Sequence, residues 1–342
     1  MKYPIFSILG LVLLLTSCDF FGIDEIEPFF FRTEGADLLV DIDGNTESGV
    51  FVIFLHGGPG SGSFAYNQGY FSDKMEEDYA MVFLDQRGNG ASQGKYTKEA
   101  LNTGQISKDV YQLTQFLKAK YGDNISIFLG GHSWGGLTSA HALIHTDIQK
   151  EIKGWIEIAG AHDFKKNEIE AVKMFRQFAA EEMAKGNNLD FWEPISERVT
   201  QMDTLNITSE DSYYLNRTAF KAQAKFELTE ADLTSVRLPY LPGNSEFGVV
   251  SGASNLFGQV ALNMDANNHE LTNRLHEIEI PSLFLWGKYD FVVPPAMGLS
   301  AYNLVNTSEK EFVLFETSGH SPMRNEGELL TQKVKEFVEL YK

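Results

Sequence analysis

Three side chains in this sequence have the types needed for nucleophilic catalysis by a serine. Ser133 stands at the centre of the run Gly131–Gly135, which fits the pattern Gly-x-Ser-x-Gly. A serine hydroxyl is a poor nucleophile unless a base takes its proton and a third group orients that base. His320 and Asp290 are the candidates, and the chain order Ser, Asp, His is a known order for this trio. We expect Ser133 to be the nucleophile, His320 the general base and then acid, and Asp290 the carboxylate that orients the imidazole.

The residues around Ser133 predict a sharp turn between a strand and a helix. Residues 125–129 form an apolar, β-branched run of strand length, and residues 137–144 have helical period. Because glycine lacks a Cβ, glycine neighbours allow the strand and the helix to approach closely around a strained serine. The hydroxyl would then lie at the positive end of the helix, where developing negative charge is favoured. We expect the neighbouring His132 to be structural.

Attack on a carbonyl group creates an oxyanion, which backbone N–H groups can stabilise. One candidate donor is the amide of Trp134, directly after the serine. The other is Gly58, in a glycine-rich run after the third expected strand. The other residues of this run are expected to shape the loop without touching the reacting atoms; they are His56, Gly57, Pro59 and Gly60.

Apolar runs of strand length alternate with helical segments along most of the chain. The expected strands are residues 29–33, 38–42, 50–55, 80–84, 125–129, 152–158, 281–286 and 311–315. This alternation predicts an α/β fold with a mostly parallel, doubly wound sheet of eight strands. Asp290 and His320 each follow a strand, so they are placed to meet Ser133 at one edge of the sheet.

Residues 163–276 differ from the rest of the chain. Charged residues, aromatic residues and helical periodicity dominate there, and no buried strand is expected. We interpret this segment as a helical cap inserted between the sixth and seventh expected strands, over the carboxyl ends of the strands. Residues 29–162 and 277–342 would then form the core.

The first 28 residues are expected to lie outside the fold. Residues 5–15 are apolar but too few to span a bilayer comfortably, and residues 15–18 resemble a bacterial lipobox. The resemblance implies removal of a signal peptide, 1–17, and attachment of lipid to Cys18. An exported protein anchored to a membrane of the bacterial cell envelope would result, with residues 18–28 as a tether. The alternative is an ordinary secretory signal, but Cys18 is the only cysteine and stands where a lipobox needs it.

Composition and patterning exclude several classes of function. A hydrophobic content of 43% is that of a folded globular protein, and a net charge of −19 argues against binding nucleic acid. The glycines of residues 88–94 miss the phosphate-binding patterns. His141 and His145 lack the glutamate and third ligand of a zinc site, so no metal is expected. Asp85 and Arg87 are expected to form a structural ion pair that supports the loops.

Five motifs in order carry a resemblance to a known family. They are HGGPG at 56–60, DQRGNGAS at 85–92, GHSWGG at 131–136, GKYDFVVP at 287–294 and SGHSP at 318–322. Together they resemble the proline iminopeptidase branch of the α/β-hydrolases, over about residues 29–160 and 278–342. The resemblance implies an α/β-hydrolase fold and an enzyme without metal or organic cofactor, which releases an N-terminal residue, often proline, from a peptide.

In that family, acidic and aromatic side chains of the cap hold the substrate's amino group and its ring. The glutamates available here are Glu168, Glu170, Glu181, Glu182, Glu193, Glu197, Glu227 and Glu230, and the sequence does not choose among them. The aromatic candidates are Trp192, Tyr213, Tyr214, Phe220 and Phe226, for which packing inside the cap is the default expectation.

Two alternatives to an aminopeptidase stay open. A carboxylesterase or another small-molecule hydrolase would use the same three residues, because the cap largely sets the substrate in this fold. A lipoprotein that binds ligands without catalysis is the second, and the intact trio argues against it. Epoxide hydrolases and dehalogenases usually have an aspartate where this chain has Ser133. The expected partners are a small peptide, ester or amide substrate and, through the lipid, a membrane; the oligomeric state is left open.

Overall fold

The computed structural model describes residues 26–94, 97, 99–226, 262, 265 and 269–342. The predicted signal peptide, Cys18 and most of the tether lie outside the described residues, as do Glu227 and Glu230. Among the residues that the structure describes, no helix combines the length and the apolar character needed to cross a bilayer.

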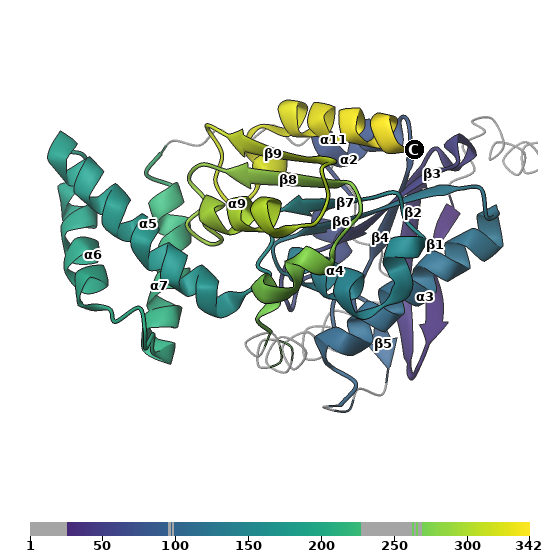
Figure 1. Cartoon of the computed structure of the whole chain (residues 1–342), viewed down its shortest axis with the longest axis horizontal. Helices are drawn as coiled ribbons and strands as arrows, with labels where there is room; N and C mark the ends of the chain where they lie inside the picture. Colours follow the sequence, from purple (N-terminus) through teal and green to yellow (C-terminus); the bar gives the residue numbers. More distant parts are fainter. Residues whose placement is uncertain (1–25, 95–96, 98, 227–261, 263–264, 266–268) are drawn as a thin grey trace, which may run out of the picture.

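A mostly parallel sheet forms the centre of the molecule (Figure 1). Its strands are β1 (Ile26–Thr33), β2 (Ala36–Gly44), β3 (Val50–Leu55), β4 (Ala80–Leu84), β5 (Gln93–Gly94), β6 (Ser126–His132), β7 (Gly154–Ile158), β8 (Ser282–Gly287) and β9 (Lys310–Phe315). They are ordered β1-β2-β4-β3-β6-β7-β8-β9, and β5 pairs with β2. The pairs β1–β2 and β2–β4 are antiparallel, whereas every neighbouring pair from β4 to β9 is parallel.

The predicted doubly wound α/β sheet is confirmed, with two differences of detail. The eight strands along the main path are those expected from the apolar runs, and β5 is an additional two-residue strand. The first strand begins at Ile26, inside the predicted tether, because backbone pairing with Ile42 of β2 extends beyond the apolar run. The predicted start of the core at residue 29 was therefore too late.

Helices cover both faces of the sheet. One face carries α3 (Thr103–Tyr121), α4 (Trp134–His145) and α9 (Pro295–Leu304), and the other carries α2 (Tyr70–Glu76) and α11 (Gly327–Tyr341). Figure 1 shows α11 along one side of the strands and α3 and α4 along the other. The shorter helices are η2 (Thr46–Ser48), η3 (Ser63–Ala65), η4 (Asp147–Lys150), η5 (Leu271–Glu277) and α10 (Pro322–Asn325).

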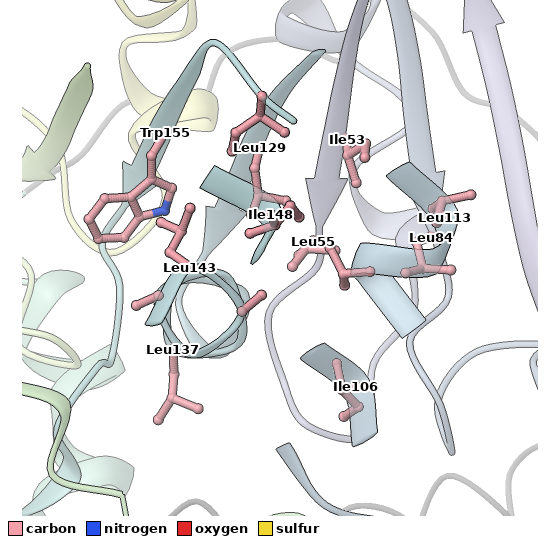
Figure 2. Packing of buried hydrophobic residues seen from close by; sticks show 14 of the residues in the cluster. Ile53, Leu55, Leu84, Ile106, Leu113, Leu129, Leu137, Leu143, Ile148 and Trp155 are labelled. Carbon is pink, nitrogen blue, oxygen red and sulfur yellow. The ribbon is translucent and has the colours of Figure 1, made fainter. Parts of the chain in front are cut away.

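Two apolar layers hold these helices to the sheet, since side chains alternate between the faces of a strand. Ile53 and Leu55 of β3 face α3 and α4, whereas Val52 and Phe54 face α2 and α11. Figure 2 shows the first layer, in which Ile53 and Leu55 lie among side chains such as Leu143 of α4. Burying each such side chain contributes about 1.5–3 kcal/mol.

Three of the described helices between β7 and β8 form a separate body at the end of the sheet. They are α5 (Phe164–Lys185), α6 (Leu189–Gln201) and α7 (Ser209–Gln223), and Figure 1 shows them grouped at one end of the molecule. Phe175, Trp192 and Val199 are buried in their own apolar core, which Phe291 from the loop after β8 joins. The described part of residues 163–276 thus supplies helices that face the loops after the parallel strands.

Candidate active site

Ser133 lies on a strained turn between β6 and α4. Its φ and ψ are 57° and −118°, in a region that residues other than glycine rarely adopt. A Cβ on Gly135 would lie 2.1 Å from the carbonyl oxygen of Leu55, and one on Gly131 would lie 2.2 Å from the carbonyl oxygen of Gly135. The turn therefore needs glycine at both positions, for the close approach that the sequence predicted.

The structure brings Ser133, His320 and Asp290 together in one hydrogen-bonded line. His320 Nε2 is 2.9 Å from Ser133 Oγ, and His320 Nδ1 is 2.9 Å from Asp290 Oδ2. The three residues come from the loops after β6, β9 and β8, so the parallel order of the strands brings them to one edge. Because a carboxylate only accepts, Nδ1–H donates to Asp290 and Nε2 is left to accept from the serine hydroxyl. This geometry suits abstraction of the serine proton.

Backbone amides hold the carboxylate of Asp290 in place. Asp290 is fully buried, and its Oδ1 accepts from the amides of Val292 and Val293 at 2.9 and 2.8 Å. Its Oδ2 is then directed at His320. The carboxylate thus has a separate partner for each oxygen, as a buried polar group requires.

A cavity of about 600 Å³ opens onto Ser133 and His320. Gly58 and Trp134, the predicted donors to an oxyanion, both line it, as do Gly57 and Pro59. A Cβ on Gly57 would lie 3.3 Å from the Cβ of Ser133, so the glycine-rich loop passes directly beside the serine. Apolar side chains from the cap helices and from the loop after β8 line much of the remainder, among them Phe164, Leu215, Phe291 and Val292.

His56 lies behind this loop and is fully buried. Its Nδ1 is 2.7 Å from the carbonyl oxygen of Gly57, and its Nε2 accepts from the amide of Gln86 at 3.1 Å. Burial lowers the pKa of His56, which keeps the ring neutral and able to accept and donate at the same time. The side chain therefore supports the loop from outside the cavity.

The expected ion pair between Asp85 and Arg87 was wrong. Arg87 makes a bidentate pair with Asp109 of α3, with both N···O distances 2.8 Å. Asp85 instead accepts from the amide of Ser63 at 2.6 Å and from that of Ala91 at 2.6 Å. A bidentate pair needs a carboxylate that faces the guanidinium, and Asp109 does so, whereas loop amides occupy Asp85. Both residues still support the loops.

Within the described part of the cap, one glutamate lines the cavity. Of the six predicted candidates that the structure describes, Glu168 of α5 lines it and the others do not. Burial raises the pKa of Glu168, and the hydroxyl of Ser212 of α7 opposes this shift. Among the aromatic candidates, Tyr213 and Phe220 line the cavity, whereas Trp192, Tyr214 and Phe226 pack within the cap as expected by default.

Sequence reasoning missed two residues that contact this site. Tyr66 lines the cavity and its hydroxyl lies 2.8 Å from His132 Nδ1. Gln223, at the end of α7, accepts from the amide of His320 at 3.0 Å through its Oε1. Neither residue belongs to a motif, so only their positions in the fold reveal them.

His141 and His145, considered above for zinc, stack with their ring centroids 3.8 Å apart. His141 Nδ1 lies 2.8 Å from the hydroxyl of Ser107. Within the described part of the chain, no group of three or more potential ligands is arranged to hold a metal.

The sheet carries a strained serine on a strand-to-helix turn, and an aspartate and a histidine follow later strands. This arrangement defines the α/β class of hydrolases. A family model described as alpha/beta hydrolase fold matches residues 50–324. The chain therefore belongs to the α/β-hydrolase fold family, which confirms the prediction from the motifs.

Relatives within this family include enzymes named as peptidases. A probable aminopeptidase of Bacillus subtilis (strain 168) is 27% identical over 293 residues, which are 82% of this chain and 86% of that protein. A proline iminopeptidase of Clostridioides difficile (strain 630) is 26% identical over 298 residues, which are 86% and 91% of the two chains. The solved structure of an esterase from Exiguobacterium antarcticum has a TM-score of 0.58 and 18% identity, over 91% of this chain and 98% of that one. At 18% identity, the similarity to the esterase shows a shared fold only.

Proposed function

We propose that this protein is a serine hydrolase that releases N-terminal residues, preferably proline, from peptides. The observation that carries the proposal is the line Ser133–His320–Asp290 at a cavity that Glu168 also lines. The relatives named as an aminopeptidase and a proline iminopeptidase, each matching most of the chain, support the same activity.

The reaction would proceed through an acyl-enzyme. Ser133 Oγ attacks the carbonyl carbon of the N-terminal residue while its proton passes to His320 Nε2. The amides of Gly58 and Trp134 stabilise the oxyanion, and His320 then gives the proton to the leaving amine. A water molecule, deprotonated by His320, hydrolyses the ester and restores Ser133. Asp290 stays ionised and stabilises the imidazolium in each half of the reaction.

Glu168 would select for substrates with an unblocked amino terminus. An ammonium group in the cavity would be attracted to its carboxylate, and this attraction is strengthened where burial has removed water. A substrate with an acylated amino terminus has no positive charge and would leave the partly buried carboxylate unpaired. The cavity wall would therefore favour peptides with an unblocked first residue.

A carboxylesterase on the same three residues is the second candidate. It is favoured by the apolar part of the cavity wall, which would accept the acyl chain of an ester as readily as a proline ring. The two candidates differ in whether a substrate without an amino group is cleaved.

Four substrates and one variant separate these candidates. The purified protein and its Ser133→Ala variant are given a proline arylamide, the N-acetylated form of that compound, an alanine arylamide and a short acyl ester. Fastest cleavage of the unblocked proline arylamide, abolished in the variant, is the expected result. Equal cleavage of the blocked and unblocked arylamides would contradict the aminopeptidase. Cleavage of the ester alone, lost in the variant, would favour the esterase.

We also propose that lipid on Cys18 anchors the protein to a membrane of the bacterial cell envelope. The support is the lipobox-like run before Cys18 and the absence of any other cysteine in the sequence. In a bacterial host, the wild type is expected in the membrane fraction and a Cys18→Ser variant outside it. Equal membrane association of both proteins would contradict the proposal.

A further inference from the structure

A chain of hydrogen bonds connects the glycine-rich loop to the backbone of His320. The amide of Gly57 donates to Tyr66 Oη at 3.0 Å, and Tyr66 Oη lies 2.8 Å from His132 Nδ1. His132 Nε2 in turn lies 2.7 Å from the carbonyl oxygen of His320. Two side chains therefore link a loop after β3 to a loop after β9, across the end of β6, the strand that precedes Ser133.

The direction of each hydrogen bond follows from the groups at the two ends. The amide of Gly57 can only donate and the carbonyl of His320 can only accept. The hydroxyl of Tyr66 accepts from Gly57 and has its own proton to give to His132 Nδ1. His132 must then carry its proton on Nε2 and donate it to His320. One neutral form of His132 satisfies all three bonds.

The surroundings keep both side chains in this form. The side chain of His132 is buried, with an exposed fraction of 4%. Burial lowers the pKa of His132 to about 3 and raises that of Tyr66 to about 12. Protonating His132 would also place a positive charge beside the ring of His320, whose centroid is 4.7 Å away. The chain of hydrogen bonds therefore keeps the same direction while His320 takes and returns a proton in the proposed reaction.

The residues joined by these hydrogen bonds lie next to reacting groups. Gly57 precedes Gly58, the proposed oxyanion donor, and His132 precedes Ser133. His320 is the proposed base, and its carbonyl is held by a side chain adjacent to the nucleophile. The geometry points to Tyr66 and His132 as positioning residues that set the oxyanion loop and the His320 loop at fixed distances from Ser133. The inference rests on the proposed role of Ser133 as nucleophile.

The rate at which a fluorophosphonate labels Ser133 in the full chain tests this inference. Labelling needs the nucleophile, the base and the oxyanion donors, but it does not depend on the natural substrate. We expect Tyr66→Phe to label at least tenfold more slowly than the wild type, and His132→Ala at least as slowly as Tyr66→Phe. His132→Gln, which retains a donor toward the carbonyl of His320, should recover part of the loss. A displacement near 1 Å costs on the order of 100-fold in comparable sites.

Two control variants change the same residue types elsewhere. Tyr79 is buried and donates to Glu339, and His141 is buried beside Ser107. The labelling rates of Tyr79→Phe and His141→Asn should be within twofold of the wild-type rate, even where the unfolding midpoint of the variant is lower. For whichever of the four substrates the wild type cleaves, Tyr66→Phe should lower kcat and leave KM within twofold, since Tyr66 acts through the loops.

The outcomes separate this inference from the proposed function. If Tyr66→Phe and His132→Ala label as fast as the wild type, the positioning role is wrong and the hydrolase stands. If His132→Gln is labelled no faster than His132→Ala, the hydrogen bond to the His320 carbonyl does not set the labelling rate. This result would also overturn the inference. If the wild type labels but cleaves no arylamide, the aminopeptidase fails, yet slower labelling of the variants still supports the positioning role. A folded wild type that does not label would overturn both.

Discussion

The two oxygens of Asp290 have different partners, and this division sets the tautomer of His320. Backbone amides of Val292 and Val293 bind Oδ1, so an asparagine at this position would place its carbonyl oxygen there. Its NH₂ group would then face His320 Nδ1 and donate to it. The proton of His320 would move to Nε2, which could no longer accept from Ser133.

We therefore expect Asp290→Asn to lower kcat by about a thousandfold to ten-thousandfold without unfolding the protein. Steady-state kinetics on the best substrate, together with the unfolding midpoint, measure the effect. A kcat within tenfold of the wild type in a folded variant would show that Asp290 does not orient His320.

Glu168 is the residue for which a test of amine recognition is sharpest. Glu168→Gln keeps the size of the side chain and removes its charge, so KM for an unblocked arylamide should rise about tenfold or more. Cleavage of a neutral ester should stay within about twofold, because the ester has no ammonium group. An equal loss of arylamide and ester cleavage would show that Glu168 stabilises the cap and does not bind the substrate amine.

Glu170→Gln is the matched control. Glu170 lies on the same helix, pairs with Lys173 and does not line the cavity. Its KM for the unblocked arylamide should match that of the wild type. A rise as large as in Glu168→Gln would mean that the net charge of the cap, rather than one carboxylate, attracts the substrate.

The packing of α4 against β3 depends on a glycine in the first turn of the helix. A Cβ at position 135 would meet the backbone carbonyl of Leu55 at 2.1 Å, and backbone cannot move aside as a flexible side chain does. We expect Gly135→Ala to lower the free energy of unfolding by about 3 kcal/mol or more. Urea unfolding measures this loss.

Gly327→Ala provides the comparison at the start of α11. A Cβ there would lie 3.7 Å from its nearest neighbour, Tyr70, which is ordinary contact. Its free energy of unfolding should therefore change by no more than about 1 kcal/mol, and upward if at all. Similar losses in both variants would show that the close approach of position 135 to Leu55 does not account for the loss in Gly135→Ala.

For the molecule as a whole, buried neutral histidines make stability depend on pH. Burial lowers the pKa of His132 and of His141 to about 3 in the folded protein, whereas an unfolded histidine titrates near 6.5. Between these values the unfolded chain binds more protons, so stability is full above pH 6.5 and is lost as the pH falls. Each histidine contributes up to about 1.4 kcal/mol per pH unit in this range.

His141→Asn should weaken this dependence, because it removes one of these histidines and lies outside the site. Urea unfolding at pH 7.5 and 5.5 should show a loss of stability on acidification that is smaller by about 1 kcal/mol in the variant than in the wild type. An identical loss in both proteins would mean that His141 is not kept neutral by the fold.

Much of this architecture follows from signals that are local in the sequence. Runs such as residues 50–55 are apolar throughout because both faces of the strand are covered, and their length predicts a buried strand. The glycines around Ser133 are needed because a Cβ at position 131 or 135 would lie 2.2 or 2.1 Å from a backbone oxygen. Asp290 and His320 each follow an expected strand, which placed them to meet Ser133 at one edge of the sheet, and the structure brings them together.

Contacts between distant residues were decided by the tertiary structure alone. Nothing local in the sequence pairs Arg87 with Asp109 rather than Asp85, distinguishes Glu168 from the other cap glutamates, or links Tyr66 to His132. Each of these contacts joins residues on different elements and depends on the direction in which a side chain leaves its strand, helix or loop. Periodicity and composition specify which face of an element is buried. The partner of a polar side chain is specified only when the elements have packed, because a hydrogen bond requires two atoms to meet within about 3 Å.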